Sequence, residues 1–243
     1  MKFLHGDADW AASIDMRKPM SRREFFAKFF SHYTIPLYLF GAAVTLAAAV
    51  VIADSAWPIV GSFLLVAVAY PFVEFLLHRF VLHGPLYRMN WTAALWRRLH
   101  YVHHMDPNDL SVLFGAPYTT IPAVLAIAAP IGYLAFGLTG LAAASSAGFC
   151  ALIVYEFHHA AAHLPVAFKS SLLKHMRRHH LLHHFHSEQG NYGIVTDVAD
   201  RAIGTVYEGA GNVGKSPTVR NLGYTDEQAR KYPWVAKLGG ESR

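Results

Sequence analysis

Two long stretches of the chain contain no lysine or arginine, and they limit what it can fold into more than any other feature. They run from residue 29 to 78 and from residue 99 to 168. Each holds two apolar segments joined by a few small or polar residues. A transmembrane helix needs about 20 mainly apolar residues to cross about 30 Å of hydrocarbon. The pattern therefore predicts two membrane hairpins.

The overall composition agrees with a membrane protein. Only 15% of the residues are charged and 53% are hydrophobic, whereas a soluble domain usually carries about 25% charged residues. The four expected crossings are residues 33–53, 57–77, 112–136 and 141–157.

The positive charge is confined to the flanks of these crossings. All 21 basic residues fall in segments 1–28, 79–98 and 169–243, which lie on one side of the membrane if the crossings pair as two hairpins. The positive-inside rule places that side in the cytoplasm. We expect an all-α integral membrane protein, in a bacterial inner membrane, with both termini cytoplasmic. The same distribution argues against nucleic-acid binding despite the net charge of +5.

The chain divides into three parts on this basis. Residues 1–32 form a cytoplasmic segment that ends in an expected interfacial helix, where Ser21 and Glu24 fit a capping box and four phenylalanines make one apolar stripe. Residues 33–206 form the membrane domain with its cytoplasmic helical cap. Residues 207–243 are expected to be a loosely ordered cytoplasmic tail.

Ten of the 16 histidines stand in groups with helix-like spacing. Spacings of three and four place side chains on one helix face, while the first pair, five apart, needs a helix end or a turn between its members. Every group follows or precedes an expected crossing on the cytoplasmic side, so two adjacent hairpins bring all of them together. The ten are His78 and His83; His100, His103 and His104; His159 and His163; and His180, His183 and His184.

This arrangement predicts a two-metal site. Neutral imidazole is the commonest protein metal ligand, and ten imidazoles are too many for one ion. Imidazole suits zinc, copper, iron and nickel, so the residues alone leave the metal open. His158, His175 and His179 are ambiguous, because each neighbours or shares a helix face with a proposed ligand.

Carboxylates near the histidines are candidates to support them. Ligating histidines usually donate their second N–H to a carboxylate or a carbonyl. Glu74 lies one turn before the first group and Glu156 lies just before the third, so we expect both to accept such bonds. Asp109 and Asp200 are further candidates.

At these residues the chain resembles the fatty acid hydroxylase/sterol desaturase superfamily of integral-membrane oxygenases. The resemblance covers about residues 60–206. Its four boxes appear in order as HRFVLH, HYVHHMDPNDLSVLFGAP, YEFHHAAAH and HLLHHFHSEQGNYGIVTDVADRAIGT. Within the superfamily, the chain is most similar to lipid 2-hydroxylases that act on ceramide-type acyl chains.

The resemblance implies an iron-dependent monooxygenase whose two Fe ions are held by the ten histidines. Two electrons and O2 would insert one oxygen atom into a C–H bond of a membrane lipid and release the other as water. Purified members can carry zinc in the same site. The chain lacks the His-Pro-Gly-Gly signature of the haem domain fused to fungal members, which implies a separate electron donor, either a cytochrome, a ferredoxin or a reductase.

Carbon 2 of an acyl chain is the favoured target, because it lies just beneath the head group, at the depth expected for the histidines. Carotenoid, sterol and aminolipid head-group oxygenases are alternatives within the superfamily. A histidine-rich metal transporter would carry ionisable residues deep in its crossings, and these crossings contain essentially none there. A zinc hydrolase would use metal-activated water, but the boxes match oxygenases. Oligomeric state and substrate chain length stay open.

Overall fold

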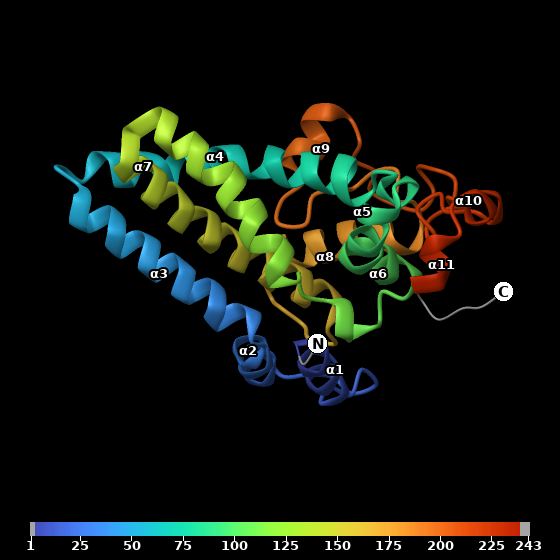
Figure 1. The fold of residues 1–243 in the computed structure, drawn as a ribbon. Coiled ribbons are helices and arrows are strands. Elements are labelled where there is room, and N and C mark those ends of the chain that lie inside the picture. The colour runs from blue at the N-terminus through green and yellow to red at the C-terminus, as the bar shows by residue number, and fades with distance from the viewer. Residues whose placement is uncertain (1–2, 239–243) are drawn as a thin grey trace.

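The computed structural model describes residues 3–238, with side chains described from residue 7. Figure 1 shows a bundle of long helices that carries a group of shorter helices at one end. In the described part of the chain, extended pairing is limited to one isolated bridge between Met20 and Val166. The all-helical expectation is confirmed.

Three helical segments among the described residues are long and apolar enough to cross a membrane, namely Thr34–Ile52, Trp57–Arg88 and Leu110–His163. The first is α3. The second begins with α4 (Trp57–Leu76) and the third contains α7 (Pro117–His163). The third segment holds both crossings of the second expected hairpin.

Although it is one continuous element, α7 is itself a helical hairpin. Phe136 and Gly137 have non-helical dihedral angles, and Gly137 has φ +62°, a conformation that glycine adopts without steric cost. Beside this reversal, a Cβ added at Gly132 would lie 2.1 Å from the carbonyl oxygen of Gly140. The first arm (residues 117–135) and the second arm (residues 138–163) therefore touch backbone to backbone near the turn.

Small residues also bring α3 and α4 close to this hairpin. A Cβ on Gly41 of α3 would lie 3.0 Å from the ring of Phe149, and a Cβ on Gly61 of α4 would lie 2.6 Å from the ring of Phe136. In Figure 1 the loop between α3 and α4 lies at the same end of the bundle as the bend in α7, and the shorter helices lie at the other end.

The helix expected at the end of the N-terminal segment is present as α2 (Arg22–Ser31), and its capping bond forms between the Ser21 side chain and the Glu24 N–H. Phe25 and Phe29 are buried in the core, while the other two phenylalanines of the stripe are exposed. The stripe therefore faces both the protein and its surroundings.

A further helix, α1 (Phe3–Ala12), was not expected from the sequence. Its Asp7 carboxylate accepts a hydrogen bond from His32 Nε2 at 3.0 Å and pairs with Arg98 at 3.3 Å. The indole N–H of Trp10 donates to the carbonyl of Lys28. These contacts tie α1 to α2 and to the segment that precedes His100.

The shorter helices surround the end of the bundle that carries the histidines. They are the π-helices Leu77–Leu82 and Arg97–Tyr101, the 3-10 helices Leu86–Arg88 and Leu110–Val112, α5 (Asn90–Trp96), α6 (Val102–Met105), α8 (Ser171–Phe185), α9 (Val198–Ile203), α10 (Asp226–Lys231) and α11 (Trp234–Leu238).

Residues 219–238 of the tail are packed and partly helical, unlike the loosely ordered tail expected from the sequence. Leu222, Tyr224 and Val235 are buried in a cluster with Tyr87 and Trp96. The sequence pattern did not reveal this packing because the apolar residues of the tail are widely spaced among glycines and charges. They pack on the aromatic surface of the segment that follows the first histidine pair.

Candidate metal centre

The ten histidines singled out by their spacing come together in two groups of five. Within each group, one ring nitrogen per residue lies within 4.8 Å of all the others. Nine of the ten are buried and His83 is half-buried. Group A is His78, His83, His100, His104 and His183, and group B is His103, His159, His163, His180 and His184.

The pair spaced by five residues, His78 and His83, is brought together by a π-helix. The His83 N–H donates to the His78 carbonyl at 3.0 Å, which is the i→i+5 bond of that helix type. Their ring centroids lie 4.9 Å apart. A spacing that suits no α-helical face thus places both rings in group A.

The second box is divided between the two groups. The π-helix Arg97–Tyr101 runs directly into α6. His100 and His104, four residues apart, belong to group A, and His103 belongs to group B. The fourth box is divided in the same way, because α8 contributes one histidine to group A and two to group B. Each group is thus assembled from three boxes, and two boxes serve both groups.

The nitrogens of group A are spaced as ligands of one ion would be. His78 Nε2 and His83 Nε2 each lie 3.0 Å from His100 Nε2, and His183 Nε2 lies 3.1 Å from His83 Nε2. Metal–imidazole bonds are about 2.0–2.1 Å long, and two such bonds at a right angle separate their nitrogens by about 3 Å. The donor set therefore fits a metal ion.

The protonation of these rings supports the same conclusion. His78 Nδ1 contacts the Tyr192 carbonyl and His183 Nδ1 contacts the Gly190 carbonyl. A carbonyl only accepts hydrogen bonds, so Nδ1 carries the proton and Nε2 of each neutral ring presents a lone pair. Lone pairs that face one another at about 3 Å repel unless a cation lies between them, which a metal ion would supply.

The ring nitrogens of group B are also spaced as ligands of one ion would be. His159 Nε2 lies 3.0 Å from His103 Nε2, and His163 Nε2 lies 2.9 Å from His180 Nε2. Neither ring nitrogen of His184 has a hydrogen-bond partner, although the side chain is fully buried. A buried polar atom without a partner costs about 1–3 kcal/mol, and a bound metal ion would remove that cost.

Burial keeps these imidazoles neutral. It lowers the pKa of His104 to about 3. Burial and neighbouring imidazoles also lower the pKa well below the usual value for the other five site histidines outside the apolar segments, which are His100, His103, His180, His183 and His184. The neutral form is the one that binds metal.

Backbone carbonyls, and not the expected carboxylates, orient the rings of group A. Besides the carbonyls of Tyr192 and Gly190, the Val219 carbonyl accepts from His104 Nδ1 at 2.9 Å. All three carbonyls come from the part of the chain that follows α8. Sequence reasoning missed them because a carbonyl is present at every residue and leaves no pattern.

The four carboxylates proposed to support the histidines do not hydrogen-bond to any of the ten. Glu156 accepts from the Gly115 N–H at 2.9 Å, and Asp109 accepts from the Ser111 N–H at 3.0 Å. Each of these two carboxylates therefore accepts a hydrogen bond from a backbone N–H and not from a histidine.

Glu74 and Asp200 do not contact the ten histidines directly. They hydrogen-bond to the loop of residues 190–196, which does. Glu74 Oε1 accepts from the Ile194 and Val195 N–H groups at 2.6 and 3.1 Å. On the other side, Asp200 accepts from the N–H groups of Tyr192 and Gly193 at 3.0 and 2.6 Å. Two buried carboxylates thus clamp the loop whose carbonyls orient His78 and His183.

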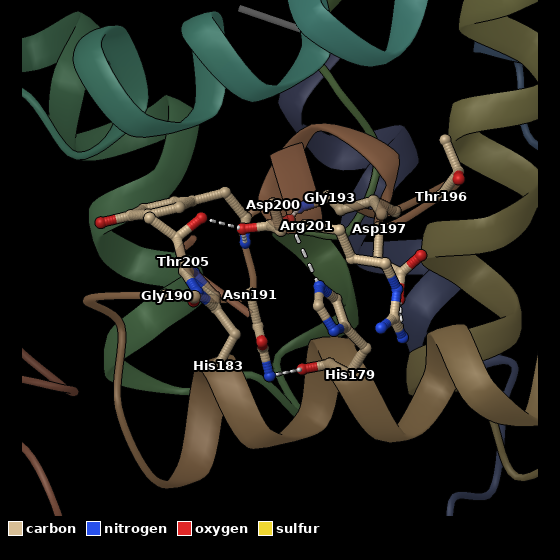
Figure 2. Close-up of polar contacts among 12 residues, drawn as sticks. His179, His183, Gly190, Asn191, Gly193, Thr196, Asp197, Asp200, Arg201 and Thr205 are labelled. Atoms are coloured by element: carbon tan, nitrogen blue, oxygen red, sulfur yellow. Dashed lines mark hydrogen bonds and ion pairs between the residues drawn. The ribbon is translucent and has the colours of Figure 1, made fainter. Parts of the chain in front are cut away.

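Figure 2 shows Asp200 at the centre of its network, with Thr205 and His179 also donating to it. Burial alone would raise the pKa of Asp200, but the hydrogen bonds from His179, Thr205 and the two loop N–H groups lower it to about 2. The group is therefore ionised at neutral pH. Asn191, at φ +57°, holds the same loop to the carbonyls of His179 and Tyr207.

The histidines of ambiguous role lie outside both groups. His179 pairs with Asp200 at 3.3 Å, and His175 pairs with Asp197 at 2.8 Å. His175, His179 and Asp197 form a smaller cluster with metal-like spacing, but Arg201 already pairs with Asp197 at 2.7 Å. His158 belongs to neither group.

An apolar cavity of about 260 Å³ adjoins the histidines between α4 and the two arms of α7. His78 and His100 of group A and His103 and His159 of group B line it. A molecule in this cavity would contact both groups at once.

We expect Asp200→Asn to lower the free energy of unfolding by about 1–3 kcal/mol, because it weakens hydrogen bonds to a buried charge. The contribution of the native carboxylate is fully present above about pH 4 and is lost as the pH falls through about 2. Melting temperature in detergent measures the effect. Asp197→Asn, which removes a partly exposed ion pair, is the matched control and should change stability little. Equal losses in both variants would contradict the role given to Asp200.

A second prediction concerns the tail. Glu188 Oε1 accepts from the hydroxyls of Ser216 and Thr218 at 2.9 and 2.5 Å, and this anchors the segment whose Val219 carbonyl orients His104. Thr218→Val should weaken metal binding by group A, while Thr218→Ser, which keeps the hydroxyl, should retain it. Metal content after dialysis against a weak chelator measures the difference. Equal metal loss in both variants would show that the hydroxyl is not the cause.

A family model described as fatty acid hydroxylase matches residues 63–205. Fatty acid 2-hydroxylase of Mus musculus is 31% identical over 144 residues, which cover 58% of this chain and 38% of that protein. Dihydroceramide fatty acyl 2-hydroxylase FAH2 of Arabidopsis thaliana is 28% identical over 134 residues, or 55% of each chain. The chain thus spans less than two thirds of the length of these curated relatives.

A solved structure of full-length Scs7p, in which only the hydroxylase domain is visible, has a similar fold. The TM-score is 0.64 at 20% identity, over 76% of this chain and 69% of that one. The family match spans all ten histidines of groups A and B together with Glu74 and Asp200. This chain belongs to the fatty acid hydroxylase family.

Proposed function

We propose that the protein is a membrane-bound lipid hydroxylase that inserts one oxygen atom from O2 into a C–H bond of an acyl chain, at carbon 2. The observation that carries this proposal is the apolar cavity, because histidines of both groups line the same end of it. The relatives named as fatty acid 2-hydroxylases and dihydroceramide fatty acyl 2-hydroxylase support the same substrate class.

Groups A and B are proposed to hold one iron ion each. Imidazole suits iron as well as zinc, so zinc in a purified preparation would be compatible with this assignment. Bound iron would supply the redox chemistry by which O2, two electrons and two protons convert a C–H bond to C–OH and release one water. The electrons are proposed to come from a separate redox protein on the cytoplasmic side.

The residues of the chain then have three tasks. The ten imidazoles present neutral nitrogens at fixed positions. The carbonyls of Gly190, Tyr192 and Val219 hold the Nδ1 protons of three rings, which sets the tautomer that binds metal. The apolar walls of the cavity bind hydrocarbon and exclude water from the histidines.

The proposed topology has four crossings, formed by α3, α4 and the two arms of α7. The loop between α3 and α4 and the bend in α7 contain no lysine or arginine, whereas all 21 basic residues fall in segments 1–28, 79–98 and 169–243. The positive-inside rule then places the histidines and both termini in the cytoplasm. A site at the helix ends suits carbon 2, which lies just beneath a lipid head group.

Single substitutions should remove the two ions separately. His83→Ala lies in group A and His163→Ala lies in group B, so each should lower bound metal from two equivalents per chain to about one. His186→Ala is the control, since His186 contacts the Val213 carbonyl and belongs to neither group. Elemental analysis of protein purified in detergent gives the counts. A variant of either group that keeps both equivalents would refute its ligand assignment.

Whole-cell lipids should contain species heavier by one oxygen atom when the protein is expressed with a suitable reductase. Isotopically labelled O2 should enter the product, and fragment ions should place the hydroxyl on carbon 2. His103→Ala should abolish the product while the protein stays in the membrane. Oxygen found on a sterol or carotenoid ring, or on a head group, would assign a different substrate. No oxygenated lipid at all would refute the proposed activity.

A further inference from the structure

The cavity beside the histidines extends far along the bundle. Along α4 and the π-helix that continues it, the lining runs from Val66 to His78, and along the second arm of α7 it runs from Gly148 to His159. At about 1.5 Å of rise per residue, these lengths are about 18 and 16 Å. The two helices thus give similar values for the depth of the cavity. A cavity that held only the reacting carbon would be much shallower.

The character of the lining changes along this depth. Its ionisable and hydroxyl-bearing groups, among them Glu74, Tyr70 and Tyr155, lie within about two turns of a site histidine. Beyond them the walls are formed by aliphatic residues and glycine. The deep part therefore suits an unbranched hydrocarbon that enters with its polar end at the histidines.

Close packing of the helices closes the deep end. A Cβ added at Gly132 would lie 2.5 Å from Ala144 Cβ, so the two arms of α7 leave no space between them there. On the other side, the ring of Phe136 packs directly on Gly61 of α4. These contacts lie beyond Val66, at the end of the bundle away from the histidines.

The arms already converge before this end. A Cβ added at Gly148 would meet Val124 Cγ1 at 2.8 Å and Ala128 Cβ at 3.1 Å. Ala128, Gly148 and Val124 all line the cavity. The hairpin therefore tapers from the histidines toward its own turn.

We propose that this closed end sets the acyl length that the protein accepts, with Val66, Ala128 and Ile131 as the residues that meet the methyl end of the chain. An extended chain advances about 1.2 Å per bond, since three bonds of a polypeptide span about 3.3–3.6 Å. A depth of about 16–18 Å beyond the reacting carbon thus holds about 14 bonds, which corresponds to acyl chains of about 16 carbons. The inference rests on the proposed acyl hydroxylation.

Variants that fill or widen the deep end test this inference. Val66→Phe and Ile131→Phe should shift the preferred substrate to shorter chains, whereas Val66→Ala combined with Ile131→Ala should shift it to longer ones. Val68→Phe and Leu134→Phe are matched controls on the same helices. Their native side chains are 72% and 85% exposed, so these substitutions should leave the preference unchanged.

The measurement is the distribution of hydroxylated product from a series of saturated acyl lipids shorter and longer than the expected length. Metal content and melting temperature of each variant are recorded alongside. Opposite shifts in the filled and widened variants, at full metal content, would support the inference. If filling the end prevents folding, the widened variant still decides.

An unchanged distribution in the folded variants would overturn the assignment of the closed end while leaving acyl hydroxylation intact. A wild-type preference for chains much longer than the cavity would do the same. Absence of hydroxylated product from the wild type at every chain length would instead overturn the proposed function. The two failures are therefore distinguishable.

Discussion

Ten neutral imidazoles whose lone pairs converge in a buried space are the constraint on which the rest of the structure depends. Such nitrogens repel one another at about 3 Å unless cations lie between them, so their positions must be fixed by the groups around them. The backbone supplies much of that support. Carbonyls of Gly190, Tyr192 and Val219 fix three rings of group A, and two buried carboxylates hold the loop that carries the first two carbonyls.

The long helices of the bundle form both the walls of the apolar cavity and part of the histidine site. The π-helical turn that continues α4 carries two histidines of group A, and the end of the second arm of α7 carries two of group B. The same two helices form walls of the apolar cavity. Glycines and alanines let the arms of α7 touch near the turn, and the cavity lies between the arms nearer the histidines. The taper of the hairpin thus determines both where the hydrocarbon can lie and which end of it meets the histidines.

Much of this organisation was predictable, and the reasons differ between features. The apolar segments and the ten histidines stand out because composition and helical spacing are local properties of the sequence. The division into groups A and B was not predictable, because neighbours such as His103 and His104 point to different groups once the helix is placed. Glu74 and Asp200 stood out in the sequence as carboxylates near the histidines, but their partners are loop N–H groups, which no sequence pattern marks.

The tail shows another limit of sequence reasoning. Leu222, Tyr224 and Val235 have no regular spacing, so residues 207–238 resemble a disordered extension, yet they form a core with Tyr87 and Trp96. Packing of this kind depends on a partner surface, here Tyr87 and Trp96, that lies far away in the sequence. Its contact with His104 makes the tail part of the metal centre's support.

The π-helical turn between His78 and His83 has a consequence for how the chain can change in length. A π-turn contains one residue more than an α-turn, and one residue rotates an α-helix by about 100°. If the same five residues were wound as an α-helix, the two rings would lie about 140° apart, so the wider π-turn is what keeps both rings in group A. The loop between α3 and α4 could gain or lose residues without moving a ligand. Insertions and deletions among descendants of this chain should therefore gather at the loops remote from the histidines and avoid this single turn.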